Sequence, residues 1–203
     1  MDLLKDNILC TKNKNYKDVN FTLENEIRKI GDRQNKKTNL VCNIMTDYKT
    51  SETSKVFKNF EKWIMSSVHT MILDFSLLDK NIEPEKYLKL KNWLNRFEIY
   101  DMWGAIYQKG DYALLHGHTD DNINMVISFC YMVNVTEKCS PLIFPNSLKP
   151  WENSRIISPE NGKLIAWSPF LLHCVPPQQV DHERVIIAGN INLNEKKVTY
   201  YYY

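Results

Sequence analysis

Three of the five histidines and one aspartate have a spacing that suits a metal site. His116, His118 and Asp120 alternate with single residues, so on an extended strand all three side chains project to one face. Two of them can therefore bind one ion from the same side, and His173 would add a ligand from a distant strand. Imidazole and carboxylate together suit iron(II) and leave coordination positions open for other ligands. Isolated histidines at strand ends are usually only solvated, but this grouping favours a metal.

A second candidate is Arg184, which opens the apolar run 185–188. An arginine that leads into a buried strand is costly unless it meets an anion. Its planar guanidinium matches a carboxylate through two parallel hydrogen bonds, which lysine cannot reproduce. The alternative is an arginine at the surface, paired with Glu183 or Asp181.

The bulk composition is that of an ordinary soluble protein. The chain has 203 residues, 43% hydrophobic and 25% charged, which fits one domain with a sizeable core. Its net charge of +2 gives no indication of a nucleic-acid or membrane partner, and no apolar run is long enough to span a bilayer. Residues 1–6 lack the basic start of a signal peptide. The five cysteines include no C-x-x-C pair, which favours free thiols in a reducing compartment. We therefore expect a cytoplasmic location.

Apolar spacing divides the chain into a helical first part and a strand-rich second part. Steps of three and four residues predict helices ending at Gly31, running from Ser54, and starting at Pro84. A short strand is expected within 39–46. From Phe97 onward, apolar runs separated by turn residues predict strands at 97–107, 112–118, 126–135, 142–144, 162–167 and 185–193. The expected fold class is α+β, mainly β: a barrel or sandwich with helices packed on it.

The order of several short motifs resembles a known superfamily. The motifs are Trp103, Tyr107-x-x-Gly110-Asp111-Tyr112, His116-x-His118-x-Asp120, Tyr131, Pro159-x-x-Gly162-Lys163-Leu164-Ile165, His173-x-Val175-x-Pro177 and Arg184. Together they resemble the 2-oxoglutarate/Fe(II)-dependent oxygenases, above all a branch often encoded by phages, and more distantly the prolyl hydroxylases. The resemblance covers about residues 97–194. A phage origin would place the protein in the host cytoplasm.

The resemblance implies a double-stranded β-helix (jelly roll) with N-terminal packing helices. Within one domain, 1–203, residues 1–95 would support the 96–195 core, and 196–203 would form a tail. The implied cofactors are Fe(II), 2-oxoglutarate as co-substrate, and O2. His118, Asp120 and His173 would be the catalytic metal ligands. Arg184 would bind the far carboxylate of 2-oxoglutarate, helped by a hydroxyl from Tyr107 or Tyr112.

A second register of the metal pair is also consistent with the motifs. The interval from Gly110 to His116 matches a pattern in which His116 and His118 are the ligands, and Asp120 orients an imidazole. We favour His118 and Asp120, because a carboxylate lowers the charge of the site and suits iron(II).

The implied activity is a dioxygenase that hydroxylates a substrate and releases succinate and CO2. The resemblance leaves that substrate open among a protein side chain, a nucleobase and a small metabolite, and it says nothing of the oligomeric state. Two alternatives remain. One is a cupin-like metalloprotein that does not use 2-oxoglutarate, since Gly110-x5-His116-x-His118 matches half of a cupin motif. The other is a non-enzymatic jelly-roll binding module.

Overall fold

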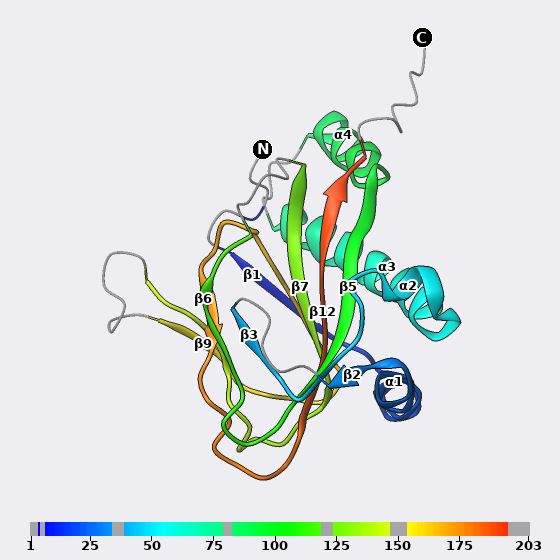
Figure 1. Cartoon of the computed structure of the whole chain (residues 1–203). Coiled ribbons are helices and arrows are strands. Elements are labelled where there is room, and N and C mark those ends of the chain that lie inside the picture. The colour runs from blue at the N-terminus through cyan, green and yellow to red at the C-terminus, as the bar shows by residue number, and fades with distance from the viewer. Residues whose placement is uncertain are drawn as a thin grey trace.

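Two antiparallel β-sheets face each other, and helices cover the outer face of the larger sheet (Figure 1). The computed structural model describes residues 4, 7–33, 39–78, 83–118, 124–146 and 154–194. The larger sheet has seven strands, in the order β1 (Ile8–Lys12), β10 (Lys163–Trp167), β7 (Met125–Asn134), β12 (Arg184–Leu193), β5 (Phe97–Tyr107), β4 (Ile44–Met45) and β2 (Asp32–Arg33). The smaller sheet has five, in the order β3 (Leu40–Val41), β6 (Tyr112–His116), β11 (His173–Val175), β8 (Leu142–Phe144) and β9 (Arg155–Ile157). This is the expected mainly β, double-stranded β-helix.

Three of the four packing helices among the described residues are those that the sequence predicts, and the shortest is an addition. The predicted helices are α1 (Tyr16–Ile30), α3 (Lys55–Leu77) and α4 (Pro84–Leu94), and the added one is the short α2 (Thr50–Thr53). At the start of α3, the Ser54 hydroxyl accepts a hydrogen bond from the Phe57 amide, which satisfies one of the unpaired donors of a helix N-terminus. The apolar stripe of α3 is buried against the larger sheet, at Phe57, Phe60, Ile64, Val68, Met71 and Ile72. No helix in the described ranges is both long and apolar enough to cross a membrane.

Strand alternation on β5 separates two hydrophobic cores. Met102 and Ile106 belong to the core beneath the helices. Trp103, Ala105 and Tyr107 point the other way, into the core between the two sheets. The same alternation on β12 turns Arg184 toward the space between the sheets, because Val185 and Ile187 belong to the helix-side core. The inner face of the β5–β12 pair is therefore the wall on which a site can be built.

The first fifty residues contribute more strand than the sequence predicts. The expected strand at 39–46 is two short ones, interrupted at Cys42 and Asn43, so that β3 pairs with β6 and β4 pairs with β5. The chain thus crosses from one sheet to the other. β1, β2 and β9 lie at sheet edges and are too short to give a clear alternating pattern. The supporting region is therefore part of both sheets.

Candidate metal centre and adjoining pockets

His116 and His173 are brought together by strand pairing. His116 ends β6 and His173 begins β11, and the two residues are directly opposite in the antiparallel register. Their ring centroids lie 4.2 Å apart. No sequence pattern predicts this pairing, because it depends on how two short strands of the smaller sheet align.

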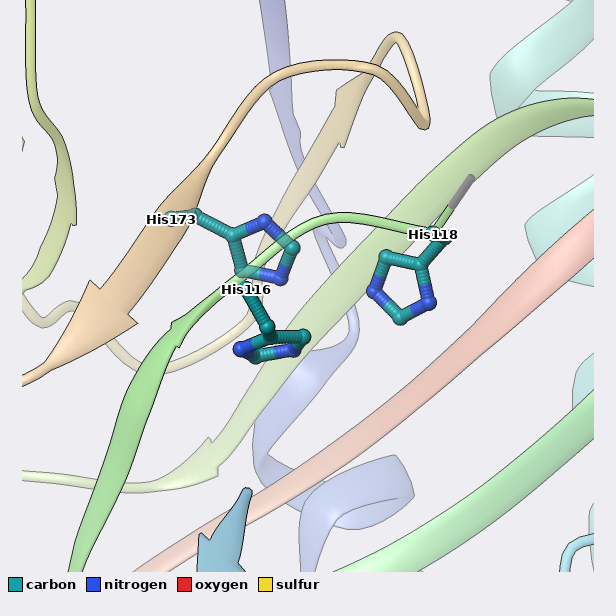
Figure 2. A group of neighbouring side chains, drawn as sticks. All are labelled: His116, His118 and His173. Atoms are coloured by element: carbon teal, nitrogen blue, oxygen red, sulfur yellow. The ribbon is translucent and has the colours of Figure 1, made fainter. Parts of the chain in front are cut away.

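His118 completes a group of three imidazoles. It follows β6 after one residue, and its amide donates a hydrogen bond to the Pro169 carbonyl at 2.9 Å, which ties this part of the chain to the segment before β11. Nitrogens of His116, His118 and His173 all lie within 4.8 Å of one another, and Figure 2 shows the rings turned toward a common space. Asp120 lies outside the described residues, so its place in a metal site stays a prediction.

Backbone hydrogen bonds select the tautomer of two of the rings. His116 Nδ1 lies 2.7 Å from the Leu114 carbonyl oxygen, and His173 Nδ1 lies 3.0 Å from that of Leu171. A carbonyl only accepts, so each Nδ1 carries the proton and donates it. Each Nε2 is then left with a lone pair. Histidines that bind metals commonly have their second nitrogen fixed in this way.

Burial keeps the three imidazoles in the form that binds metal. Desolvation, with repulsion from the neighbouring rings, lowers the pKa of His173 to about 3 and that of His118 to about 4. Desolvation also lowers the pKa of His116, against the opposing effect of the Leu114 carbonyl. All three are therefore neutral at pH 7, and a metal ion need not displace protons from them.

Arg184 lies in the same cavity as the three histidines. It is 1% exposed, and its Nε makes no hydrogen bond. The surface alternative is wrong: Glu183 pairs with Arg28 at 2.7 Å, and Asp181 pairs with Lys109 at 3.2 Å. No acid among the described residues forms an ion pair with Arg184. A buried cation without a counter-ion is strongly unfavourable, so this position suits an anionic ligand such as a carboxylate.

Tyr107 is the tyrosine beside that guanidinium. It is directly opposite Arg184 in the β5–β12 register, and the Arg184 Cζ lies 5.1 Å from the centre of its ring. Burial raises the pKa of Tyr107, so its hydroxyl stays protonated and can donate. Tyr112 is on β6, paired with Val41, and is not among the residues that line this cavity. Of the two tyrosines, Tyr107 is therefore the one that shares a cavity with Arg184.

The inner cavity, which holds Arg184 and the histidines, is small. Its volume of about 50 Å³ accommodates roughly four water-sized groups. The residue types suit a dicarboxylate. Leu40 and Trp103 line both this cavity and a second one beside it.

That outer cavity contains functional candidates that the sequence analysis missed. It has a volume of about 210 Å³ and shares Leu40, Trp103, His116 and His118 with the inner one. Its other polar lining residues are Asn39, Tyr48, Asp101 and Asn190. Strand alternation was the available signal for Asp101, because it shares the parity of Trp103 and Tyr107 on β5.

Comparison with known proteins supports the fold. No protein-family model matches the sequence, and no curated protein is significantly similar to it. Solved structures do match: a prolyl-4-hydroxylase from Pseudomonas putida has a TM-score of 0.62 and 14% identity, over 94% of this chain and 95% of that one. HygX from Streptomyces hygroscopicus, solved with nickel and 2-oxoglutarate bound, has a TM-score of 0.63 and 7% identity, over 94% and 84%.

A prolyl hydroxylase from Trichoplax adhaerens has a TM-score of 0.62 and 15% identity, over 96% of this chain and 87% of that one. It was solved in complex with a peptide fragment of the hypoxia-inducible factor oxygen degradation domain. The chain therefore has the fold of solved 2-oxoglutarate/Fe(II) oxygenases along nearly its whole length. At these identities the likeness concerns the fold, and function has to be argued from the site.

Proposed function

We propose that this protein is a 2-oxoglutarate- and Fe(II)-dependent oxygenase of the hydroxylase type. One atom of O2 becomes the hydroxyl group of the substrate, and the other enters the new carboxylate of succinate, while C1 of 2-oxoglutarate leaves as CO2. The single observation that supports this best is the shared cavity of Arg184 and the three histidines. A metal site alone would not need a buried guanidinium that has no acidic partner among the described residues.

The proposed role of the chain is binding and orientation, while iron(II), when bound, supplies the activation of O2. His118 and His173, joined by His116 in one of the two registers, would hold the metal through nitrogens that carry no proton. Asp120 remains the carboxylate candidate, either as a direct ligand with His118 and His173 or as a partner of an imidazole. Both registers of the sequence motif thus stay open.

Arg184 would bind the far carboxylate of 2-oxoglutarate, with the Tyr107 hydroxyl as a second donor. Apolar side chains such as Ile186, Leu142 and Val175 surround this position and exclude water. In such surroundings a charge-assisted hydrogen bond to a carboxylate is stronger than in solvent. The co-acid would then extend from Arg184 toward the histidines, where its keto-acid end can reach the metal.

A cupin-like metalloprotein is the second candidate, because all the metal-binding candidates among the described residues are imidazoles. That alternative gives Arg184 no ligand. The two functions differ in whether an organic acid joins the metal, and this difference can be measured directly.

The test is an anaerobic titration of the metal-free chain with Fe(II), followed by 2-oxoglutarate. We expect one iron per chain and then a visible metal-to-ligand charge-transfer band that saturates at one equivalent of 2-oxoglutarate. Iron binding without this band would support the cupin-like alternative. A chain that binds no stoichiometric metal would be a non-enzymatic jelly roll, and the oxygenase proposal would be wrong.

A further inference from the structure

The outer cavity has a carboxylate at the end opposite Arg184. On the antiparallel strands β5 and β12, Tyr107 is paired with Arg184. Asp101 is paired with Asn190, six residues away from the first pair on both strands. At 3.3 Å per residue the two ends are about 20 Å apart. His116 and His118 line both cavities, and His173 lines the inner one, so the metal centre lies between an end with a buried cation and an end with a carboxylate.

Asp101 is held in place by a chain of hydrogen bonds across three strands. The Ser128 hydroxyl donates to Asn190 Oδ1 at 2.7 Å, and Asn190 Nδ2 donates to Asp101 Oδ1 at 2.8 Å. Ser128 and Asn190 are both buried, so this chain is shielded from solvent. It uses Asp101 only as an acceptor, a role that a neutral asparagine could also fill.

The negative charge of Asp101 is thus not needed by its structural partners. No basic side chain among the described residues forms an ion pair with it. Lys49 lies nearby, but its Nζ donates to the Tyr100 carbonyl and lies 4.4 Å from the centre of the Tyr100 ring. Desolvation raises the pKa of Asp101 to about 6, so at neutral pH the group is ionised although burial disfavours the charge.

Two aromatic rings form an apolar wall beside this carboxylate. Tyr48 and Trp103 contact edge to face, with ring centroids 4.9 Å apart and an interplanar angle of 76°. Both line the outer cavity with Asp101, His116 and His118. Methylene groups pack well on such rings, and a cation near an aromatic face is stabilised further.

We propose that the outer cavity binds a substrate bearing a primary ammonium group on an alkyl stem. The ammonium would pair with Asp101, and the stem would lie along Tyr48 and Trp103, with a carbon of the stem facing the three histidines. Hydroxylation of that carbon rests on the proposed oxygenase function. Binding of the ammonium group to the outer cavity does not depend on that function. A free alkylamine and a lysine side chain of a peptide share this chemistry.

The experiment measures binding of n-butylammonium to the full chain by ligand-observed NMR, before and after addition of Zn(II) and 2-oxoglutarate. Butan-1-ol and butyrate are the comparison probes, because they keep the stem and change the charge. We expect butylammonium to bind at least tenfold more tightly than either. Acetyl-Gly-Lys-Gly-amide, titrated in parallel, distinguishes a peptide side chain from a free amine according to which of the two binds more tightly.

Asp101→Asn keeps an acceptor for Asn190 and removes the charge, so it should weaken butylammonium binding at least tenfold and leave butanol binding unchanged. Asp181→Asn is the matched control: it changes the same charge at an exposed position outside both cavities. Circular dichroism checks that each variant is folded. Equal butylammonium affinity in the wild-type chain and in Asp101→Asn would overturn the proposal.

The two proposals can fail separately. A chain that binds butylammonium through Asp101 but gives no 2-oxoglutarate-dependent band keeps the amine site and loses the oxygenase function. If it gives the band but binds neither butylammonium nor the lysine peptide, the amine site is wrong and the oxygenase function stands.

Discussion

His116 and His173 occupy directly opposed positions on β6 and β11, and each Nδ1 is bonded to the carbonyl oxygen two residues before it. The two rings are therefore fixed by the same local device on two different strands. This symmetry directs both Nε2 atoms toward the space that His118 also faces. It also makes His173 the residue on which any metal site here depends, since it alone comes from the second strand.

Removing His173 should abolish stoichiometric iron binding. Removing a residue that only hydrogen-bonds to a metal ligand weakens metal binding by roughly 10- to 100-fold. Removing a ligand itself should weaken iron binding by more than that. The measurement is the iron content after anaerobic gel filtration of His173→Ala. His182→Ala is the control, because His182 is exposed, lines neither cavity, and has its Nε2 3.0 Å from Asn134 Oδ1. Iron retained at one equivalent in His173→Ala would remove this residue from the site.

Comparing His116→Ala with Asp120→Ala distinguishes the two registers of the metal pair. If Asp120 is a direct ligand, its loss should release iron, and loss of His116 should be tolerated better. If His116 and His118 are the ligands, the order reverses. The same iron measurement applies. The described geometry places His116 within 4.8 Å of the other two rings, which supports testing it first.

Arg184→Lys should weaken 2-oxoglutarate binding by roughly 10- to 100-fold, because the bidentate fork is lost while the charge is kept. Iron affinity should change much less, since Arg184 is not in the group of side chains that could hold the metal. Saturation of the charge-transfer band gives the first quantity, and iron titration gives the second. Arg28→Lys, on the surface beside Glu24 and Glu183, is the matched control. Unchanged affinity for 2-oxoglutarate would contradict the assigned role.

Asp101→Asn should stabilise the fold at pH 7.5 and lose that advantage near pH 4. The folded-state pKa of Asp101 is raised to about 6, chiefly by desolvation, against the opposing effects of Asn190 and Lys49. The folded form therefore holds its proton more tightly than the unfolded form, and the stability of the wild-type chain falls as pH rises between about 4 and 6. The gain in the variant should be roughly 3 kcal/mol well above pH 6, because the pKa rises from 3.8 to about 6 and each unit corresponds to about 1.4 kcal/mol. Urea denaturation at several pH values measures it, and a gain independent of pH would contradict this account.

Gly104→Ala tests the packing of α1 on the large sheet. A methyl group at Gly104 would lie 2.4 Å from Ile27 Cγ1, and Ile27 is fully buried. Overpacking of this kind costs about 1–3 kcal/mol. The variant Ile27→Val removes one methyl group, so the double variant should recover part of that loss. Denaturation of the wild-type chain, the two single variants and the double variant gives the coupling free energy between Gly104→Ala and Ile27→Val. If the two changes in unfolding free energy simply add, the strain does not arise from contact with Ile27.

Several features of this protein are determined by the sequence alone, because they depend on neighbours along the chain. The helix positions follow from apolar steps of three and four residues and from Ser54, Gly31 and Pro84. The entry of Arg184 into a buried strand also follows from neighbours along the chain. The strand predicted at 112–118 ends at His116, so His118 is placed by its hydrogen bond to the Pro169 carbonyl and not by strand alternation.

The tertiary structure decided which distant residues meet. Strand alternation cannot specify that His173 pairs with His116. It also cannot specify that Glu183 and Asp181 pair with other cations while Arg184 is buried. The alignment of Asp101, Asn190 and Ser128 across three strands is equally beyond it. These outcomes depend on strand register, which is set by the packing of two cores formed from the whole chain. A register shift of one residue would turn each of these side chains to the opposite face.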